Sequence, residues 1–221
     1  MKLPWTELTF LILGWFLGLV AGPVQDWLRR CNERKQLRRA IWTELNDLRE
    51  RLAQATFVIE SKRDGISRDL LNWLRKYIVG WNGVYPSGPL SEASKRLSEL
   101  NDDEFAEIAS LSTTQDTNGL SLQRYEMRYL SSKLERIEIL PEQAQQNLLS
   151  VLTHVSFINQ HVSNSEFYRG LTFDAGISEG NHAIASAELK RCQSLVAQQA
   201  RSLVRSIDVL EVELNERKKN P

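Results

Sequence analysis

The sequence predicts an all-α protein, in which a single N-terminal transmembrane helix precedes an antiparallel cytosolic helical bundle with two long heptad-like helices. Three observations predict this fold class. One apolar run of nearly membrane length stands close to the N-terminus, and two long segments carry apolar residues at the heptad spacing of packed helices. No stretch alternates apolar and polar residues as a half-buried strand does. We therefore expect a transmembrane anchor over residues 1–27 and a cytosolic bundle over residues 28–221.

The apolar run extends from Leu8 to Val24. As a helix rising about 1.5 Å per residue it is about 24 Å long, slightly shorter than a hydrocarbon core of about 30 Å. Trp5 and Trp27 flank the run, and tryptophan is enriched at both membrane–water interfaces. We expect these two residues to act as interface anchors.

The distribution of charge predicts the orientation of this helix. Cations are scarce before the run, where Lys2 and the amino terminus stand alone. A basic cluster, expected to face anionic lipid, follows the run: Arg29, Arg30, Arg34, Lys35, Arg38 and Arg39. The positive-inside rule then predicts a single-pass protein of the cell (inner) membrane with its N-terminus outside and its C-terminal body in the cytosol. A cleaved signal peptide is the rival interpretation, but its basic residues would precede the apolar run.

Three glycines within the run are four residues apart: Gly14, Gly18 and Gly22. Such spacing lets two membrane helices approach closely, so we expect a glycine-zipper surface and a homo-oligomer. The alternative is that glycine is simply common in membrane helices. In a ring of such helices, Glu7 would lie near one end and is a possible pore-mouth residue, because carboxylate rings can favour cations.

Two stripes of apolar residues at alternating spacings of three and four predict the long helices of the bundle. The first consists of Ile41, Leu45, Leu48, Leu52, Ala55 and Ile59. The second consists of Leu189, Cys192, Val196, Ala200, Leu203, Ile207, Leu210 and Leu214. Both stripes are long enough to pair with one another, so we expect these two helices to be partners.

Shorter helices are predicted between the two stripes. The first covers residues 67–79, and the second is capped by Ser91 and has Ala93, Leu97 and Leu100 inward. The third follows a cap at 101–103, and the fourth covers residues 122–139. The fifth is opened by Pro141 and ends near Arg169. Ser178 is expected to cap the last helix, which continues to about residue 218. The aromatic residues Trp81, Tyr85, Phe167, Tyr168 and Phe173 stand next to turns. We expect them to tuck into the end of the bundle, and a pocket or partner surface is the alternative.

Composition limits the range of partners. The 221 residues carry a formal net charge of zero, so no nucleic-acid partner is expected. The expected partners are the lipid bilayer, further copies of the chain and a cytosolic protein. Cys31 and Cys192 are far apart and predicted to be cytosolic, so we expect reduced thiols.

No catalytic, metal or cofactor site is predicted. His154 and His161 are seven residues apart, which is wider than the spacing of four that places two histidines on one metal in a zinc helix. None of the three histidines follows an arginine by four to six residues, the spacing used in one class of all-helical ribonucleases. The chain also lacks a nucleophile elbow, a phosphate-binding loop and a dinucleotide fingerprint.

These observations favour a non-enzymatic, membrane-anchored scaffold or regulator that self-associates at the inner membrane face. The first alternative is an oligomeric pore-forming or membrane-perturbing effector, of the kind found in antiphage defence or toxin systems. This alternative rests on analogy of architecture. The second alternative is a divergent helical nuclease.

Overall fold

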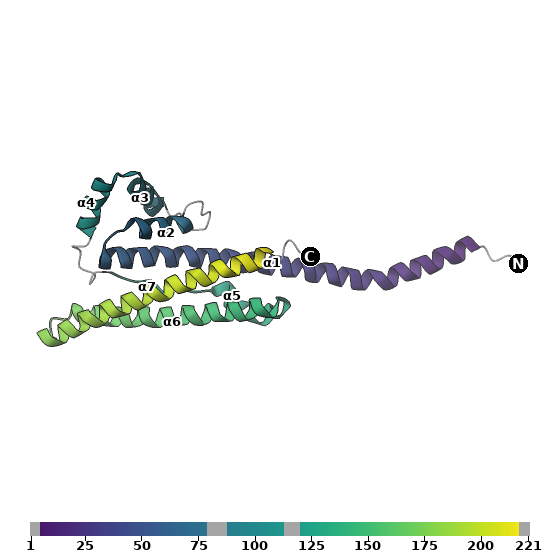
Figure 1. Ribbon diagram of the computed structural model, residues 1–221. Coiled ribbons are helices and arrows are strands. Elements are labelled where there is room, and N and C mark those ends of the chain that lie inside the picture. Colours follow the sequence, from purple (N-terminus) through teal and green to yellow (C-terminus); the bar gives the residue numbers. More distant parts are fainter. Residues whose placement is uncertain (1–4, 79–87, 113–119, 217–221) are drawn as a thin grey trace. The chain divides into compact units, whose positions relative to one another are not determined.

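In a computed structural model, the described residues form helices joined by nonhelical segments and contain no strand, so the all-α prediction is confirmed (Figure 1). Backbone is described for residues 5–78, 88–112 and 120–216, and side chains for the same residues except 5–8, 11, 12, 112 and 213–216. The helices are α1 (Trp5–Asp64), α2 (Arg68–Ile78), α3 (Gly88–Glu99), α4 (Asp102–Ser112), α5 (Arg128–Ser132), the 3₁₀ helix η2 (Leu134–Ile139), α6 (Glu142–Thr172) and α7 (Glu179–Glu216).

The chain divides into two compact units, Met1–Trp42 and Thr43–Pro221. The predicted boundary between residues 27 and 28 lies within the first unit. Helix α1 supplies most of the first unit and the opening helix of the second.

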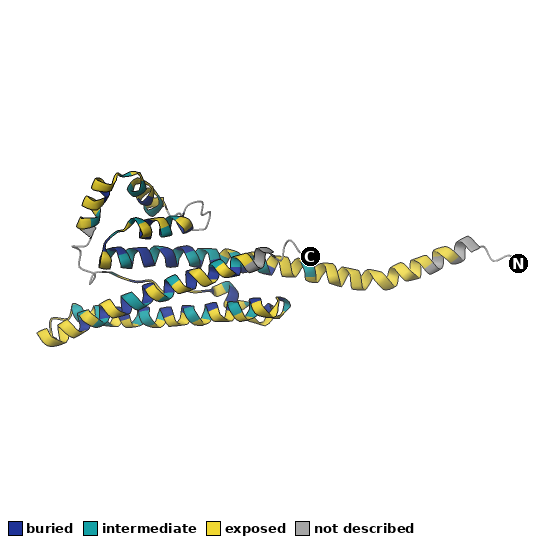
Figure 2. Ribbon diagram, viewed as in Figure 1, coloured by how far each residue is buried: buried dark blue, intermediate teal, exposed yellow. Residues whose placement is uncertain are grey.

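The two predicted apolar stripes form the centre of the bundle (Figure 2). On α1, Leu45 and Leu52 are fully buried, and only Ala55 of the predicted stripe is half-buried. On α7, every described member of the stripe is buried, and Leu214 lies outside the described side chains. Burial extends beyond both stripes to Ala53, Thr56, Phe57, Ala197 and Val204, so each helix buries a wider face than a two-position heptad seam.

Side-chain contacts show that α1 and α7 are antiparallel neighbours, as predicted. Arg49 of α1 contacts Asp208 and Glu211 of α7, whereas Arg63, further along α1, contacts Ser194, much earlier in α7. Helices α6 and α7 form a hairpin and lie side by side along most of their length (Figure 1). The bundle is therefore built on three long helical segments.

The start of α4 follows local capping chemistry. The Asn101 side chain accepts a hydrogen bond from the Glu104 N–H, and the Glu104 carboxylate accepts one from the Asn101 N–H, which is a complete capping box for α4. Pro141 precedes α6 directly, as predicted. The prediction for Ser91 was wrong, because α3 begins at Gly88 and Ser91 lies inside it.

The inward face of α3 was also predicted incorrectly. Ser94 is buried on this helix, whereas Ala93 is exposed and Leu97 and Leu100 are half-buried. The Ser94 hydroxyl donates to the Ser91 carbonyl, which satisfies its polar group within the helix.

The predicted continuous helix over residues 122–139 was wrong. Residues 120–127 are not helical, and α5 and η2 follow as separate short helices. The Asn159 side chain bonds both backbone groups of Tyr125, with its Oδ1 accepting from the N–H at 2.8 Å and its Nδ2 donating to the carbonyl at 2.7 Å. The Glu44 carboxylate accepts from the N–H groups of Tyr129 and Leu130, both at 2.8 Å. These side chains replace the backbone bonds that a helix would have supplied.

The turn-flanking aromatic residues do not all tuck into the bundle. Phe167 is 63% exposed and Phe173 is 71% exposed, contrary to the expectation, while Tyr168 is half-buried and lies against Phe167. Trp81 and Tyr85 lie outside the described residues. Phe167 belongs to the end of α6, and Phe173 follows it in the connection to α7.

Candidate functional site

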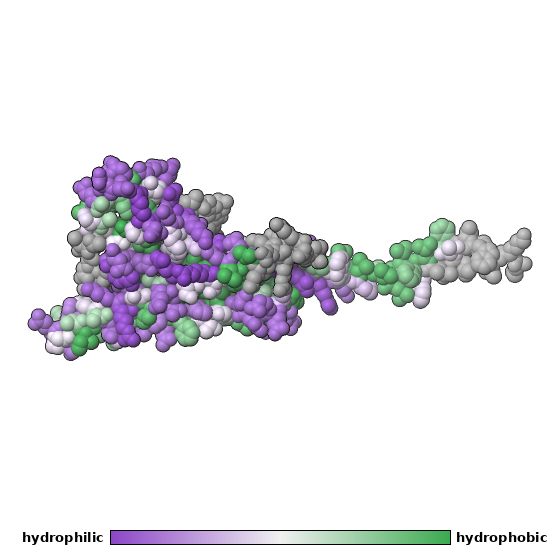
Figure 3. Space-filling model, viewed as in Figure 1, coloured by the Kyte–Doolittle hydropathy of each residue, from purple (hydrophilic) through white to green (hydrophobic). Residues whose placement is uncertain are grey.

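The first candidate site is the apolar part of α1, within the first unit. Phe10 is 77% exposed, Trp15 is 66% exposed and Trp27 is 63% exposed. Seven further large apolar side chains are exposed along the same segment: Leu13, Phe16, Leu17, Leu19, Val20, Val24 and Leu28. At about 100° per residue they surround the helix except on the side of Gly14, Gly18 and Gly22. Figure 3 shows hydrophobic surface on the visible face of this part of α1. This surface therefore has no single polar face, unlike that of an ordinary amphipathic helix.

Among the residues whose side chains are described, no helix has a stretch that is both long and apolar enough to span a bilayer. The side chains of Leu8, Leu11 and Ile12, which belong to the predicted run, are outside that set. The predicted anchor Trp5 and the possible pore-mouth residue Glu7 are outside it as well.

The three glycines of the predicted zipper face open space. A Cβ atom added at Gly14, Gly18 or Gly22 would meet no other atom within 4 Å. Nothing described in the single chain therefore requires glycine at these positions. Pro23 follows directly inside α1 and removes one backbone hydrogen-bond donor from the helix.

The basic cluster follows the apolar surface on the same helix. Arg29 pairs with Glu33 across one helical turn, with 3.1 Å between Nε and Oε1. Arg30, Arg34, Lys35 and Arg39 are exposed, and Arg38 is half-buried. The apolar surface of α1 is thus followed directly by a cationic surface on the same helix.

The second unit contains a polar network centred on Asp208 of α7. The Asp208 carboxylate accepts hydrogen bonds from Arg49 at 3.0 Å, from Lys76 at 2.8 Å and from the Tyr77 hydroxyl at 2.9 Å. Burial on its own raises the pKa of Asp208, but the hydrogen bonds from Lys76 and Tyr77 outweigh it, so the pKa lies below its usual value. Donors from α1 and α2 thus bind the same α7 carboxylate, so the network connects three helices.

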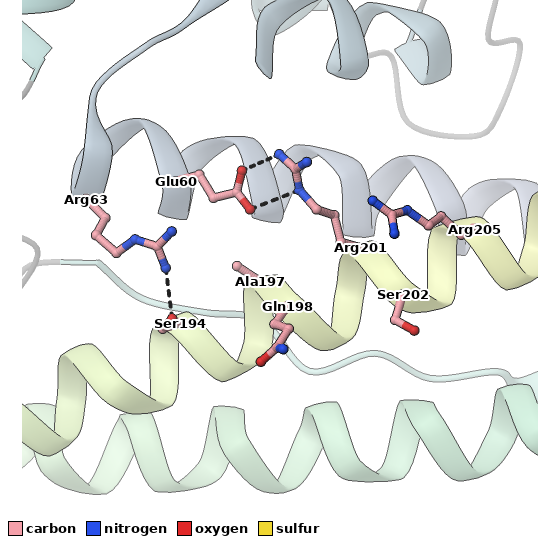
Figure 4. Close-up of a pocket in the computed structure, with 8 residues that line it drawn as sticks. All are labelled: Glu60, Arg63, Ser194, Ala197, Gln198, Arg201, Ser202 and Arg205. Atoms are coloured by element: carbon pink, nitrogen blue, oxygen red, sulfur yellow. Dashed lines mark hydrogen bonds and ion pairs between the residues drawn. The ribbon is translucent and has the colours of Figure 1, made fainter. Parts of the chain in front are cut away.

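A second polar site in this unit is a cavity of about 590 Å³ between the end of α1 and the middle of α7 (Figure 4). Its lining, which we call the arginine cavity, consists of Glu60, Arg63, Ser194, Ala197, Gln198, Arg201, Ser202 and Arg205. The lining contains three arginines and one glutamate, so its side chains carry a net positive charge. On α7 the polar residues repeat at spacings of four and three, so they form one face of the helix, opposite the apolar stripe.

Two arginines of the cavity are already held in place. Arg201 binds the Glu60 carboxylate through both Nε and Nη2, with 3.0 Å from Nε to Oε1, and its guanidinium lies 4.6 Å from the centre of the Trp73 ring. Arg63 donates to the Ser194 hydroxyl at 2.8 Å and also pairs with Asp64. Paired and stacked guanidinium groups lose little further freedom when they bind a ligand.

The histidines and cysteines form no reactive cluster among the described residues. His154 Nδ1 donates to the Ser150 carbonyl within α6, and His182 Nε2 donates to the Thr172 carbonyl across the turn between α6 and α7. The described part of the chain holds no group of three or more histidine, cysteine and acidic side chains suited to a metal ion. Burial, with a contribution from Glu188, raises the pKa of the Cys192 thiol, which lowers its reactivity at neutral pH.

Sequence reasoning missed both the Asp208 network and the arginine cavity. Their members come from segments more than 120 positions apart, and polar residues on a helix surface are usually solvated. The repeat Ser194, Gln198, Arg201 and Arg205 was a usable signal, because it runs parallel to the apolar stripe. In comparisons with protein-family models, curated proteins and solved structures, the chain matches none of them.

Proposed function

We propose that this chain is a single-pass membrane protein of the inner membrane whose helical bundle works as a non-enzymatic scaffold or regulator in the cytosol. The observation that carries the proposal is the apolar segment of α1. Ten large apolar side chains between residues 10 and 28 are exposed around one helix, on every side except that of the three glycines. Exposing such a surface to water is unfavourable by roughly 25 cal/mol per Å², and a bilayer removes that cost.

Three features of the sequence support membrane insertion in this orientation. The run Leu8–Val24 carries no charged residue, and tryptophans bracket it at positions 5 and 27. The basic cluster lies on the C-terminal side alone, which favours a cytosolic body. The partner of the bundle is proposed to be a further copy of the chain or a cytosolic protein.

Membrane extraction of single-arginine variants tests the anchor. Leu17→Arg places a cation within the apolar segment, at a cost of about 2.5–3.5 kcal/mol for membrane insertion at a helix centre. Leu149→Arg is the matched control, because Leu149 is an exposed leucine of α6 in the second unit. We expect the parent and L149R to remain in the membrane pellet after alkaline carbonate washing and L17R to shift to the supernatant or be degraded. Release of the parent chain by carbonate would overturn the proposal.

Assembly through the glycine surface is the second part of the proposal. Open space around Gly14, Gly18 and Gly22 leaves room for another helix to approach their backbone. A ring of such helices that conducts ions is the second candidate function, favoured by the same open surface. Dye release from loaded vesicles separates the two functions. A scaffold leaves vesicles sealed at all protein densities, whereas a pore releases dye in proportion to the amount of assembled protein.

A further inference from the structure

The arginine cavity holds donors that the bundle leaves unused. Among the described residues, no hydrogen bond or ion pair joins the side chains of Gln198, Ser202 or Arg205 to protein groups. Each of these three side chains offers at least one N–H or O–H donor. They lie on α7 within seven residues, about 10.5 Å along the helix axis.

Of the three arginines in the cavity, two are paired with carboxylates, and the third is paired with none that the structure describes. Glu60 neutralises Arg201, and Asp64 neutralises Arg63, whereas no carboxylate is paired with Arg205 in the described structure. Arg201 and Arg205 are four residues apart on one helix, and the Arg205 side chain extends toward Arg201 (Figure 4). An anion bound next to Arg205 would balance its charge.

We propose that the arginine cavity binds a small phosphate-bearing molecule, with Arg205 as its main contact. Guanidinium groups recognise phosphate oxygens through paired N–H donors, and the Ser202 hydroxyl and Gln198 amide add neutral donors next to them. The volume of about 590 Å³ falls within the range of about 300–1,000 Å³ typical of small-molecule sites. This site does not depend on the membrane anchor, because all of its residues belong to the second unit.

The bonds around Arg201 specify where the phosphate lies. The Glu60 carboxylate occupies the Nε and Nη2 side of Arg201 and repels a second anion there. Trp73 covers the guanidinium plane of the same arginine. The phosphate therefore binds at the Arg205 end of the cavity. The phosphate group is chemistry shared by free nucleotides and phosphorylated lipid headgroups, and the test below distinguishes these sources.

Isothermal titration of the full chain in mild detergent tests the proposal with three probes: inorganic pyrophosphate, ATP and a short-chain phosphatidylinositol phosphate. The test variant is Arg205→Gln. The matched control is Arg191→Gln, since Arg191 is an exposed arginine of the same helix, paired with Glu188, outside the cavity lining. We expect R205Q to weaken binding of at least one probe about tenfold and R191Q to leave it within about twofold.

R191Q changes the net charge by the same amount as R205Q and so separates a binding site from a general effect of charge. A third variant tests whether Glu60 competes with the ligand for Arg201. Glu60→Gln removes the anion that competes for Arg201, so we expect binding about twofold to fivefold tighter than in the parent. Binding of pyrophosphate or ATP assigns a soluble ligand, and binding of the lipid probe alone assigns a headgroup; both support the site. Equal weakening by R205Q and R191Q, or no heat from any probe at about 1 mM, would overturn the proposal.

Discussion

Arg49 of α1 and Asp208 of α7 are ion-paired, with 3.0 Å between Nη1 and Oδ1, although 159 positions separate them in the chain. The Arg49 side chain is 18% exposed and that of Asp208 is 25% exposed, so water screens the pair only partly. Arg49 also binds Glu211 at 2.7 Å, and Lys76 of α2 binds the same aspartate. One α7 carboxylate thus connects the three helices.

Neutralising this carboxylate should destabilise the bundle. We expect Asp208→Asn to lower the free energy of unfolding by about 1–3 kcal/mol, because it removes the charge from three hydrogen bonds. The measurement is urea unfolding of the full chain in mild detergent. Glu126→Gln is the control, since it neutralises a carboxylate in an exposed pair with Arg128, and it should change stability by less than about 0.5 kcal/mol. Equal effects of the two variants would show that the network does not stabilise the fold.

The stabilisation by Asp208 should depend on pH in the acid range. Its pKa in the folded protein is lowered, since the hydrogen bonds from Lys76 and Tyr77 exceed the opposing effect of burial. The carboxylate therefore contributes fully above its unfolded pKa of about 3.9, and this contribution is lost as pH falls through the lowered folded pKa. The difference in unfolding free energy between the parent and D208N should be constant from about pH 8 to pH 5 and shrink below about pH 4. A difference that stays constant in acid would contradict the assignment.

The nonhelical segment 120–127 should depend on one asparagine. Asn159→Ala removes both hydrogen bonds to the Tyr125 backbone and leaves a part-buried donor and acceptor without partners. We expect a loss of about 2 kcal/mol or more in unfolding free energy. Asn164→Ala is the matched control, as Asn164 is an exposed asparagine of the same helix and its replacement should have little effect. Hydrogen exchange at the Tyr125 amide provides a local readout, with faster exchange expected in N159A alone.

Tyr125 should ionise late in an alkaline titration. Burial raises the pKa of its phenol to about 12, and the nearby Arg51 guanidinium offsets this only in part. The neutral phenol is compatible with the fold up to its unfolded pKa of about 10, and the stability that it contributes is lost as pH rises toward the folded value. Spectrophotometric titration of the tyrosines should contain a component near pH 12 that Tyr125→Phe removes. If Y125F titrates as the parent does, Tyr125 is not the buried phenol.

Regular apolar spacing was sufficient to predict the long helices. Leu45 and Leu52 of α1, and Leu203 and Ile207 of α7, are buried as expected because a helix brings residues three and four apart onto one face. The Asn101 cap and the Pro141 start were also predictable, since their chemistry involves residues within one turn.

Several of the features that were not predicted from the sequence depend on contacts between segments far apart in the chain. Residues 122–127 contain apolar side chains at helix-like spacing, but Asn159 and Glu44 satisfy the backbone of this region from distant segments. The Asp208 network and the arginine cavity likewise depend on which helix faces meet, and spacing within one helix does not specify that. Phe173 stands next to a turn and is 71% exposed, which its position in the sequence did not indicate.

The proposal that α1 mediates self-association makes a prediction about three glycines. Gly14→Leu, Gly18→Leu and Gly22→Leu together should abolish close helix packing, and the open space at each position means that the single chain accommodates the new side chains. Phe16→Leu with Val20→Leu is the control, because these residues lie on the opposite side of the helix at about 100° per residue. Both variants keep the segment apolar, so membrane insertion should be unchanged.

The most direct measurement is the mass of the detergent-solubilised full chain, by light scattering coupled to size-exclusion chromatography, in the parent and in these two variants. We predict an oligomer for the parent and for the F16L/V20L control, and a monomer for the triple leucine variant. A parent chain that is monomeric, or a triple leucine variant that retains the mass of the parent oligomer, would contradict assembly through the glycine surface of α1.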